Sequence, residues 1–515
     1  MIVAGNYIST TGKYNHFLLS MRRASMPCFR PMSLFSNIQM RWTRPNGYGT
    51  VLRISLPLVI SMGSYTVMLF TDRIFLGRYS LDALAAATPG GLLAFMFMCF
   101  FSGVVGFTNT FVAQYIGANA PRRVGGALWQ AVYFALGAGA ILAALAPLGG
   151  PIFRWAGHTP EILKLESVYF SILMLGSVFS LLSNGIESFY SGRSLTRTIM
   201  VINLIGMAIN VPLNYVLING RLGLPELGIA GSAMATVASN AVILVLFIFT
   251  IFRKKNEAAY GVRSRWAFDR ELFGRLLKFG VPTGLQYFVD IFSFTFFLLI
   301  IGRLGRNELA ATNLAFALNS LCFLPMVGFS IAVSTLVGQA IGRGRPEDGV
   351  TATRSALHLT NAYMWTVALI FALFPAPLCN LFQSAGQDAS EFAAVRDLAV
   401  VLLRFVAFYS VLDAFSVIYS GTLKGAGDTK FIGWTVLILG FGVIVVPVYL
   451  AVVKFQAGLY TVWTFATAYV CLIALIFYWR YRQGRWKTMR VIEQPTPLPG
   501  LSAPRSGMPG ADELC

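Results

Sequence analysis

The sequence predicts an all-α polytopic membrane protein with twelve transmembrane helices in two six-helix bundles. The chain is 56% hydrophobic and only 12% charged, whereas soluble domains are about 25% charged. It contains twelve apolar runs, each of about 18 residues or more and long enough to cross a bilayer. Because soluble helices need a polar face, no soluble core could absorb so many apolar runs. The third observation is an internal repeat, which divides the spans into two equal halves.

The repeat covers residues 52–122 and 277–347, which align without a gap at a constant offset of 225 residues. We count 15 identities in the 71 aligned positions. They include Pro57 with Pro282, Gly77-Arg78 with Gly302-Arg303, Leu84-Ala85-Ala86 with Leu309-Ala310-Ala311, Gln114-x-Ile116-Gly117 with Gln339-x-Ile341-Gly342, and Pro121 with Pro346. Two similarly folded halves around a shared centre are typical of secondary transporters. The repeat therefore indicates function as well as fold.

The predicted spans follow one another with short loops, except for one longer loop between the halves. Their ranges are 50–72, 88–113, 126–149, 165–188, 194–217, 229–253, 275–300, 310–338, 353–376, 394–421, 431–453 and 459–480. Residues 50–253 and 275–480 thus form the two predicted bundles, and 254–274 form a cytoplasmic linker.

Both ends of the chain are predicted to be cytoplasmic tails. Residues 481–515 are predicted to be disordered, because the last part of this stretch is rich in Pro, Gly and Ser. Residues 1–49 lack an apolar stretch followed by a small-residue cleavage site. We expect them to be a tail, or the product of a start codon placed too early.

The net charge of +19 is explained by its placement along the chain. The termini and the even-to-odd loops hold 30 of the 40 basic residues. The positive-inside rule therefore puts the central loop and both termini in the cytoplasm. We expect the protein to lie in the inner (plasma) membrane. The excess charge also attracts anionic membrane lipids. We expect no nucleic-acid partner, since the charge is a topology signal rather than a nucleic-acid footprint.

The sequence does not predict an enzyme. It contains no HExxH, no GxSxG and no P-loop, and the missing P-loop also argues against ATP hydrolysis on this chain. The three histidines, His16, His158 and His358, are too few for a haem or multi-histidine metal site, and no two cysteines have CxxC spacing. We expect no cofactor other than a coupling ion, Na⁺ or H⁺.

Carboxylates inside transmembrane spans are the main functional candidates, because a charge in lipid is costly. Asp290 lies in the middle of the seventh span, with Gln286 one turn before it on the same helix face. Asp413 lies in the tenth span, with Tyr409 one turn before it. Two acidic faces in one half can converge on a chamber that holds a proton, Na⁺ or a cationic substrate. The alternative is that each Asp is buried and hydrogen-bonded to a neighbouring helix.

The N-terminal half offers a second set of polar candidates. Asp72 ends the first span and precedes Arg73, so it could also be an interfacial residue paired with that arginine. Asn210 and Asn214 lie one turn apart and are suited either to a cation or proton relay or to helix packing. Glu187 and Asn184, near the end of the fourth span, are secondary candidates for which a helix end in water is the alternative.

With these residues, the chain resembles the MATE family of multidrug and toxin extrusion transporters, and most closely its NorM-type branch. The resemblance runs from about Arg53 to Arg480. Several motifs carry it in order: Pro57 with Asp72-Arg-Ile-Phe-Leu-Gly77, Gln114-Tyr-Ile-Gly117, Pro212-Leu-Asn-Tyr215 through Gly223-Leu-Pro-Glu-Leu-Gly228, Gln339-Ala-Ile-Gly342, and Gly421-Thr-Leu-Lys424-Gly425-Ala-Gly-Asp428-Thr429.

The resemblance implies two bundles of six helices around a cleft and export of drugs driven by inward Na⁺ or H⁺. It implies that Asp290, eight residues after Pro282, occupies an essential acidic position that is often Glu. It places Asp413 and Tyr409 at a cation-site pair of helix ten. The residues that it places in a polar cluster of the N-terminal bundle are Asp72, Asn210 and Asn214. Two departures are Ser191, where the branch often has Asp, and the unexpected acid Glu187.

The mechanism that we expect is alternating access with competition for shared carboxylates. A proton or Na⁺ binds Asp290 and Asp413 from outside and weakens their hold on an organic cation, which leaves. Small organic cations and membrane lipids are the expected partners, and a monomer is expected. The main alternative is a flippase of the same superfamily for a lipid-linked precursor, which would need several arginines deep in the membrane. The ionisable residues of the predicted spans are mainly acidic, and Arg404 is the main exception. A membrane enzyme or a channel fits the sequence less well.

Overall fold

The computed structural model describes residues 41–155, 159–383 and 389–493 of the 515-residue chain. The chain divides into two units, Met1–Arg44 and Pro45–Cys515. Within the described part, the second unit contains twelve helical segments that are long and apolar enough to cross a membrane. The described residues contain no β-strand. The predicted all-α fold with twelve spans is confirmed.

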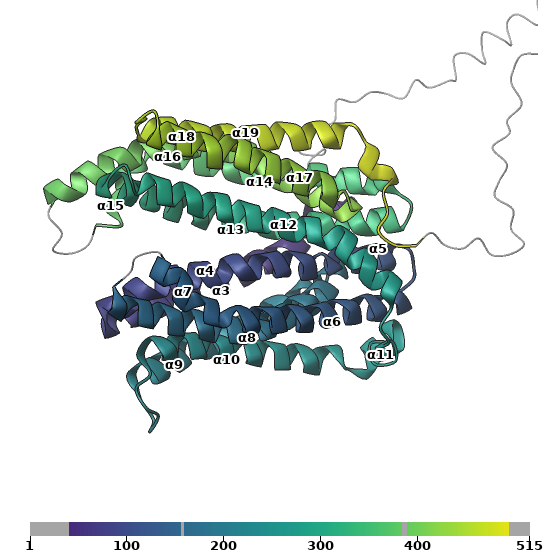
Figure 1. Cartoon of the computed structure of the whole chain (residues 1–515). Helices are drawn as coiled ribbons and strands as arrows, with labels where there is room; N and C mark the ends of the chain where they lie inside the picture. Colours follow the sequence, from purple (N-terminus) through teal and green to yellow (C-terminus); the bar gives the residue numbers. More distant parts are fainter. Residues whose placement is uncertain (1–40, 156–158, 384–388, 494–515) are drawn as a thin grey trace, which may run out of the picture. The chain divides into compact units, whose positions relative to one another are not determined.

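Six of the spans form the N-terminal bundle, drawn in purple and blue in Figure 1. They are α3 (Tyr48–Tyr79), α4 (Leu81–Gly106) continued by α5 (Thr108–Gly117), α6 (Arg122–Leu145) followed by η1 (Ala146–Leu148) and α7 (Gly149–Trp155), α8 (Pro160–Gly192), α9 (Thr196–Asn219) and α10 (Gly228–Ile251). The fourth span, α8, packs against α4, α6 and α10 and is therefore the central helix of this bundle.

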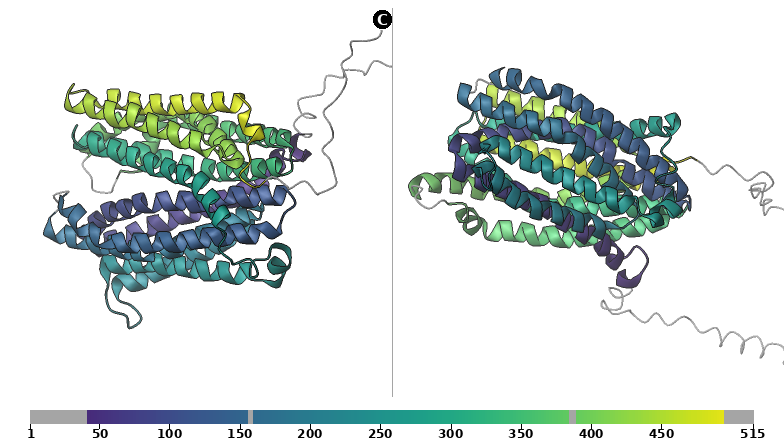
Figure 2. Two further views of the ribbon diagram at one scale, coloured as in Figure 1. Left: turned by 45° about the vertical axis from the view of Figure 1, so that its right-hand side comes forward. Right: turned by 90° about the horizontal axis from the view of Figure 1, so that it is seen from below.

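The other six spans form the C-terminal bundle, drawn in teal to yellow (Figure 1). They are α12 (Arg270–Ile301), α13 (Arg306–Gly342), α14 (Pro346–Leu373) followed by α15 (Pro375–Asn380), α16 (Ala389–Ala426), α17 (Thr429–Leu439) continued through η2 (Gly440–Val445) into α18 (Val446–Val453), and α19 (Leu459–Arg482). Here too the fourth span is central, since α16 packs against α13, α14 and α19. The bundles lie side by side in the left view of Figure 2, and α12 and α13 pack against α3, α4 and α5.

The two bundles meet along α3, α4 and α5 of the first and α12 and α13 of the second. Small residues allow the crossing. A Cβ on Gly103 would lie 2.7 Å from the Cα of Gly284, and one on Gly328 would lie 3.1 Å from the backbone nitrogen of Val59. The repeat relates Gly103 to Gly328 and Val59 to Gly284, so the same crossing occurs twice. Small residues at helix crossings allow close backbone approach in membranes.

One span is irregular next to a candidate site residue. Between α17 and α18 the helix widens into the π-helical turn η2. A Cβ on Gly440 would lie 3.0 Å from the hydroxyl of Ser293, which is one turn after Asp290 on α12. Pro447 follows at the start of α18 and lacks a backbone N–H. Such π-helical turns frequently occur at functional sites.

Several helices extend beyond their predicted spans. The seventh begins at Arg270 rather than 275, because the Asp269 side chain accepts hydrogen bonds from the backbone N–H groups of Glu271 and Leu272. The second span is two helices, with a break at Phe107. The linker contains a short helix of its own, α11 (Lys254–Tyr260).

The prediction of disorder from residue 481 onward is wrong for residues 481–493. Helix α19 ends at Arg482, the 3-10 turn η3 (Arg485–Thr488) follows, and the side chains of Trp486, Val491 and Ile492 are buried. The Pro-rich composition used for the prediction belongs to the residues that follow, whereas Trp486, Val491 and Ile492 of the preceding segment pack into the hydrophobic cores. Residues 494–515, and residues 1–40 of the predicted N-terminal tail, lie outside the described residues.

Candidate functional site

Asp290 is the centre of a polar cluster in the C-terminal bundle. The hydroxyl of Tyr469 on α19 donates a hydrogen bond of 2.9 Å to one carboxylate oxygen of Asp290. The side-chain amide of Gln286 lies 3.5 Å from the other oxygen. Among the described residues, the ammonium of Lys424 acts electrostatically on this carboxylate. The sequence prediction that Gln286 and Asp290 share a helix face is met by this contact.

Asp413 on α16 is the second acid of this cluster. Its carboxylate accepts a hydrogen bond of 2.8 Å from Ser416. Its charge acts on Asp290 and on Tyr469, so α12, α16 and α19 bring the three polar side chains within electrostatic range. Tyr409, one turn earlier, is buried against the core and also interacts with Asp413. Asp413 and Asp290 therefore act on each other electrostatically, although no hydrogen bond joins them among the described residues.

Two buried side-chain oxygens on the same face of α12 have no hydrogen-bond partner among the described residues. They are the side-chain oxygens of Gln286 and Ser293, one turn on either side of Asp290. Buried polar atoms normally have hydrogen-bond partners. Together with two carboxylates, these oxygens are the type of ligand that a hard cation such as Na⁺ takes, and they can equally surround a protonated carboxyl group. These oxygen ligands are thus suited to either coupling ion, Na⁺ or H⁺.

Asp72 lies in a separate cluster in the N-terminal bundle. It is 2% exposed and accepts hydrogen bonds from Asn214 on α9 and, at 3.3 Å, from Thr236 on α10. Asn214 also donates to Asn210 at 3.0 Å, so the predicted pair on α9 does share a face. Asp72 and Arg73 form no salt bridge, although both lie in the described part of the chain. Asp72 is therefore a buried residue rather than an interfacial one.

Glu187 joins a third polar chain within the N-terminal bundle. Asn203 on α9 donates to its carboxylate at 2.7 Å and to the hydroxyl of Ser61 on α3 at 2.8 Å. Asn184, one turn earlier, donates instead to the carbonyl of Ser102 on α4 at 3.2 Å. Glu187 thus faces α9 and α3 whereas Asn184 faces α4, so the structure does not bring these two secondary candidates together.

The bundles are hydrogen-bonded to each other at one end, which we call the joined end. Gln114 on α5 donates to the carbonyl of Gly425 at 3.0 Å, and Gln339 on α13 donates to the carbonyl of Gly192 at 2.9 Å. The repeat relates the two glutamines, and each glycine lies at the end of the fourth span of the opposite bundle. The equivalent threonines also bridge the bundles: Thr110 donates to the carbonyl of Lys424 and Thr335 to Asn109.

Residues 489–493, which we call the strap, cross the joined end. The backbone N–H of Val491 donates to Gln114 at 2.9 Å, and the hydroxyl of Tyr115 donates to Glu493 at 2.9 Å. Glu493 also lies 3.8 Å from the guanidinium of Arg275 on α12. The strap therefore contacts α5 of one bundle and α12 of the other.

Comparison with known proteins identifies the family. The sequence model of the MatE family matches residues 57–216 and 282–451, which is one match in each half of the repeat. The chain belongs to the MATE family. This is a family of membrane transporters, and the predicted resemblance to its NorM-type branch is confirmed by curated relatives with that name.

The relatives cover most of the chain. The probable multidrug resistance protein NorM of Thermotoga maritima is 28% identical over 475 residues, covering 89% of this chain and 97% of the relative. The probable NorM of Pseudomonas putida is 31% identical over 392 residues, covering 74% and 82%. The multidrug resistance protein PmpM of Pseudomonas aeruginosa is 28% identical over 392 residues, covering 74% and 79%.

Solved structures of MATE proteins share the fold. An outward-facing multidrug resistance transporter of the MATE family superposes with a TM-score of 0.78 at 22% identity, covering 87% of this chain and 98% of the other. A transporter from Pyrococcus furiosus, whose binding pocket is described as having reverse polarity, superposes equally well at 21% identity with the same coverage. At these identities the likeness concerns the fold alone.

Three polar partners in this MATE protein were missed by the sequence analysis. They are Tyr469, Asn203 and Thr236, which contact Asp290, Glu187 and Asp72 respectively. A single hydroxyl or amide in an apolar span is uncharged, and burying it in the membrane costs less free energy than burying a carboxylate. Such residues therefore do not stand out in the sequence as carboxylates do. The only signal was the repeated presence of polar side chains on spans next to those that carry an acid.

Proposed function

We propose that this MATE protein is a secondary active transporter of the inner (plasma) membrane that exports small organic compounds, mostly amphipathic cations, by antiport with Na⁺ or H⁺. The observation that supports the proposal is the electrostatic interaction of Asp290 with Asp413 in one bundle, together with two unpartnered oxygens on the helix of Asp290. Two nearby carboxylates can hold either a coupling ion or a cationic substrate. The names of the curated relatives support multidrug substrates.

Exchange follows from competition for these carboxylates. A cationic substrate and the coupling ion are both stabilised by the same negative charges, so binding of one weakens the hold on the other. Tyr287, one turn before Asp290, adds an aromatic surface to the cluster, and the ammonium of Lys424 already lies 4.5 Å from its ring centre. Cation–π contacts of this kind suit organic cations of varied shape.

Alternating access requires the joined end to open. The positive-inside rule puts this end, with the linker and the strap, on the cytoplasmic side. In the described conformation the hydrogen bonds of Gln114 and Gln339 hold the bundles together there. We propose that the coupling ion binds while this end is closed, and that rocking of the bundles then breaks these contacts and releases the ion inside.

A flippase of the same superfamily for a lipid-linked precursor is the second candidate. Such an activity needs basic side chains where this protein has acids. Arg404, the main basic residue in a predicted span, is exposed and forms no hydrogen bond or ion pair with Asp290 or Asp413 among the described residues. The acidic clusters favour a cationic substrate.

The test is transport by the purified protein in liposomes loaded with ethidium, with an imposed inward Na⁺ or H⁺ gradient. The proposal predicts efflux that follows one gradient and is abolished when that gradient is collapsed by an ionophore. Ethidium efflux that ignores both gradients, together with transbilayer movement of a fluorescent undecaprenyl-linked lipid, would instead establish the flippase.

A further inference from the structure

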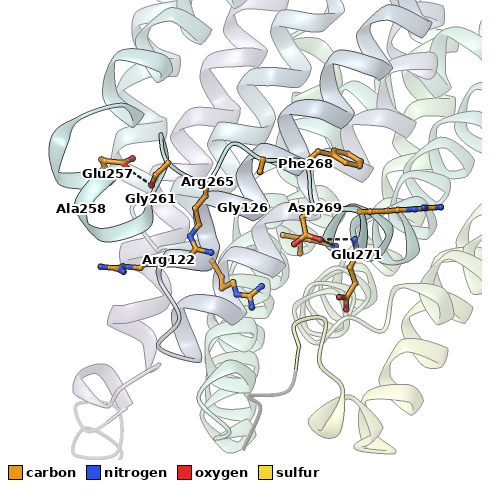
Figure 3. Close-up of a pocket in the computed structure, with 14 residues that line it drawn as sticks. Arg122, Gly126, Glu257, Ala258, Gly261, Arg265, Phe268, Asp269 and Glu271 are labelled. Atoms are coloured by element: carbon orange, nitrogen blue, oxygen red, sulfur yellow. Dashed lines mark hydrogen bonds between the residues drawn. The ribbon is translucent and has the colours of Figure 1, made fainter. Parts of the chain in front are cut away.

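A large pocket lies between the linker and the N-terminal bundle, away from the acidic clusters. Its volume is about 1090 Å³. It is lined by Arg122, Arg123, Gly126, Glu257, Ala258, Gly261, Ser264, Arg265, Ala267, Phe268, Asp269, Arg270, Glu271 and Leu272. In Figure 3 Arg265 extends from the linker toward the start of α6, where Arg122 lies, while Glu257 and Glu271 lie at opposite edges. The transport proposal assigns this pocket no role.

All three acids that line the pocket already have partners. Glu257 accepts hydrogen bonds from the backbone N–H of Arg263 and from Ser264, and these hydrogen bonds lower the pKa of Glu257. Asp269 caps the N-terminus of α12. Glu271 forms an ion pair of 2.7 Å with Arg275 on the same helix. Glu257 and Asp269 are thus hydrogen-bonded to neutral groups, and only Glu271 has a cationic partner.

The lining arginines, by contrast, make few direct contacts. Among the described residues, Arg122, Arg265 and Arg270 form no ion pair or side-chain hydrogen bond, and Arg123 lies 4.0 Å from Glu493 at its nearest. Arg122 also begins the 24-residue helix α6, whose N-terminal N–H groups favour an anion. The lining therefore carries four arginines against three carboxylates, one of which, Glu271, pairs with Arg275 outside the lining, and it keeps a small net positive charge around an open volume.

Aromatic side chains cluster beside this pocket. Trp129 on α6 donates to the carbonyl of Val262 at 2.6 Å, and Tyr133 donates to the carbonyl of Trp266. These bonds hold the linker against the outer surface of a transmembrane helix. Trp266 and Phe268 are 64% and 57% exposed there. Exposed aromatic residues beside arginines are typical of the headgroup region of a bilayer.

We propose that this pocket binds the phosphate-bearing headgroup of an anionic phospholipid, with Trp266 and Phe268 at the level of the headgroups. Arginine is the residue best suited to phosphate, because its planar guanidinium can donate two parallel hydrogen bonds. A free phosphate would use the same arginines, but the exposed aromatic residues favour an amphiphile. The bound lipid would tie the linker between the two bundles to the membrane surface.

The experiment measures binding of phosphatidylglycerol, phosphatidylcholine and glycerol 3-phosphate to the full-length protein in neutral detergent by native mass spectrometry. The test variant is R122Q/R265Q/R270Q. The matched control R343Q/R345Q/R485Q removes the same charge from exposed arginines outside the pocket. We expect phosphatidylglycerol to bind at least about tenfold more weakly to the test variant, and less than about twofold more weakly to the control.

Two results would overturn the proposal. One is equal affinity of phosphatidylglycerol for the wild type and the test variant. The other is glycerol 3-phosphate binding as tightly as the lipid, which would make the site one for a soluble phosphate. If the triple variant does not fold, the single variant R265Q tests the same contact, because Arg265 is an exposed linker residue. Its lipid affinity must then fall below that of R343Q.

Discussion

Gln114 and Gln339 occupy the same position in the two repeats, and each donates its side-chain amide to a glycine carbonyl of the opposite bundle. The distances are 3.0 Å to Gly425 and 2.9 Å to Gly192. The two contacts are therefore reciprocal, and a rocking motion of the bundles must break both together. Because each glutamine is buried, it would need a new partner in an open state. This favours two discrete arrangements over a gradual opening.

The first prediction concerns the glycines beside these glutamines. A Cβ on Gly117 would collide with the carbonyl oxygen of Gln339, and one on Gly342 with that of Gln114. Gly117→Ala should therefore destabilise the closed joined end by about 1–3 kcal/mol. Spin labels on the exposed residues Arg197 and Arg354 should show a larger population of long distances than in the unsubstituted protein.

The control for this experiment is Gly137→Ala, since a Cβ on Gly137 meets nothing within 4 Å. It should leave the distance distribution unchanged. If Gly117→Ala and Gly137→Ala gave the same distribution, the close contact at the joined end would not determine the conformation.

The second prediction concerns the strap. Glu493 accepts a hydrogen bond from Tyr115 and lies near Arg275, so Glu493→Ala removes links to both bundles. These links are partly exposed, and we expect a shift toward the open state of about 1 kcal/mol. The same pair of spin labels reports it, and Glu226→Ala, at the opposite end of the N-terminal bundle, is the control. An unchanged distribution of spin-label distances would show that the strap contacts the joined end without stabilising it.

The third prediction is about stability. Arg480 on α19 holds Asp428 with two hydrogen bonds, of 2.6 and 3.2 Å, and the side chains are only 12% and 6% exposed. Arg480→Met leaves a buried carboxylate without its partner and should cost about 3–5 kcal/mol. Lys487→Met breaks an exposed pair with Glu347 and should cost at most about 1 kcal/mol. Thermal unfolding in detergent compares the two, and equal melting temperatures would contradict the prediction.

The fourth prediction concerns the N-terminal cluster. Asn214→Leu removes a donor from the buried carboxylate of Asp72, which should destabilise the protein by about 1–3 kcal/mol. Asn219→Leu on the same helix removes only a bond to the carbonyl of Tyr215 near the helix end and should be close to neutral. In the double variant Asp72→Asn/Asn214→Leu, much of the loss should be recovered, because no charge remains buried. A double variant less stable than Asn214→Leu alone would argue against this account.

The helices could be predicted from sequence because each span is a long apolar run, and their division into two bundles followed from the repeat. The acids of the site could be predicted because a charge in an apolar span is rare. Their partners could not. Tyr469 resembles the many aromatic residues of a membrane protein until α19 is placed beside α12. The strap was missed because composition was averaged over the whole tail, in which Val491 and Ile492 are a small apolar minority.

The difference between Asp72 and Asp290 shows the same limit. Both end up buried or partly buried in hydrogen-bonded clusters, but sequence alone left Asp72 open to pairing with Arg73 at the membrane surface. The rotation of α3 about its axis determines which neighbour Asp72 faces, and in the structure that neighbour is Asn214 on α9. Residue spacing within one helix carries no information about which helix lies beside it.

The central claim is that an inward cation drives export through the carboxylates of the C-terminal bundle. Its most direct test is ethidium efflux from proteoliposomes under the driving gradient, for wild type, Asp290→Asn and the control Asp397→Asn, whose carboxylate is exposed and pairs with Arg396. The account predicts that Asp290→Asn loses gradient-driven efflux while Asp397→Asn keeps the wild-type rate. Gradient-driven efflux at the wild-type rate in Asp290→Asn would contradict it and make Asp290 a structural residue.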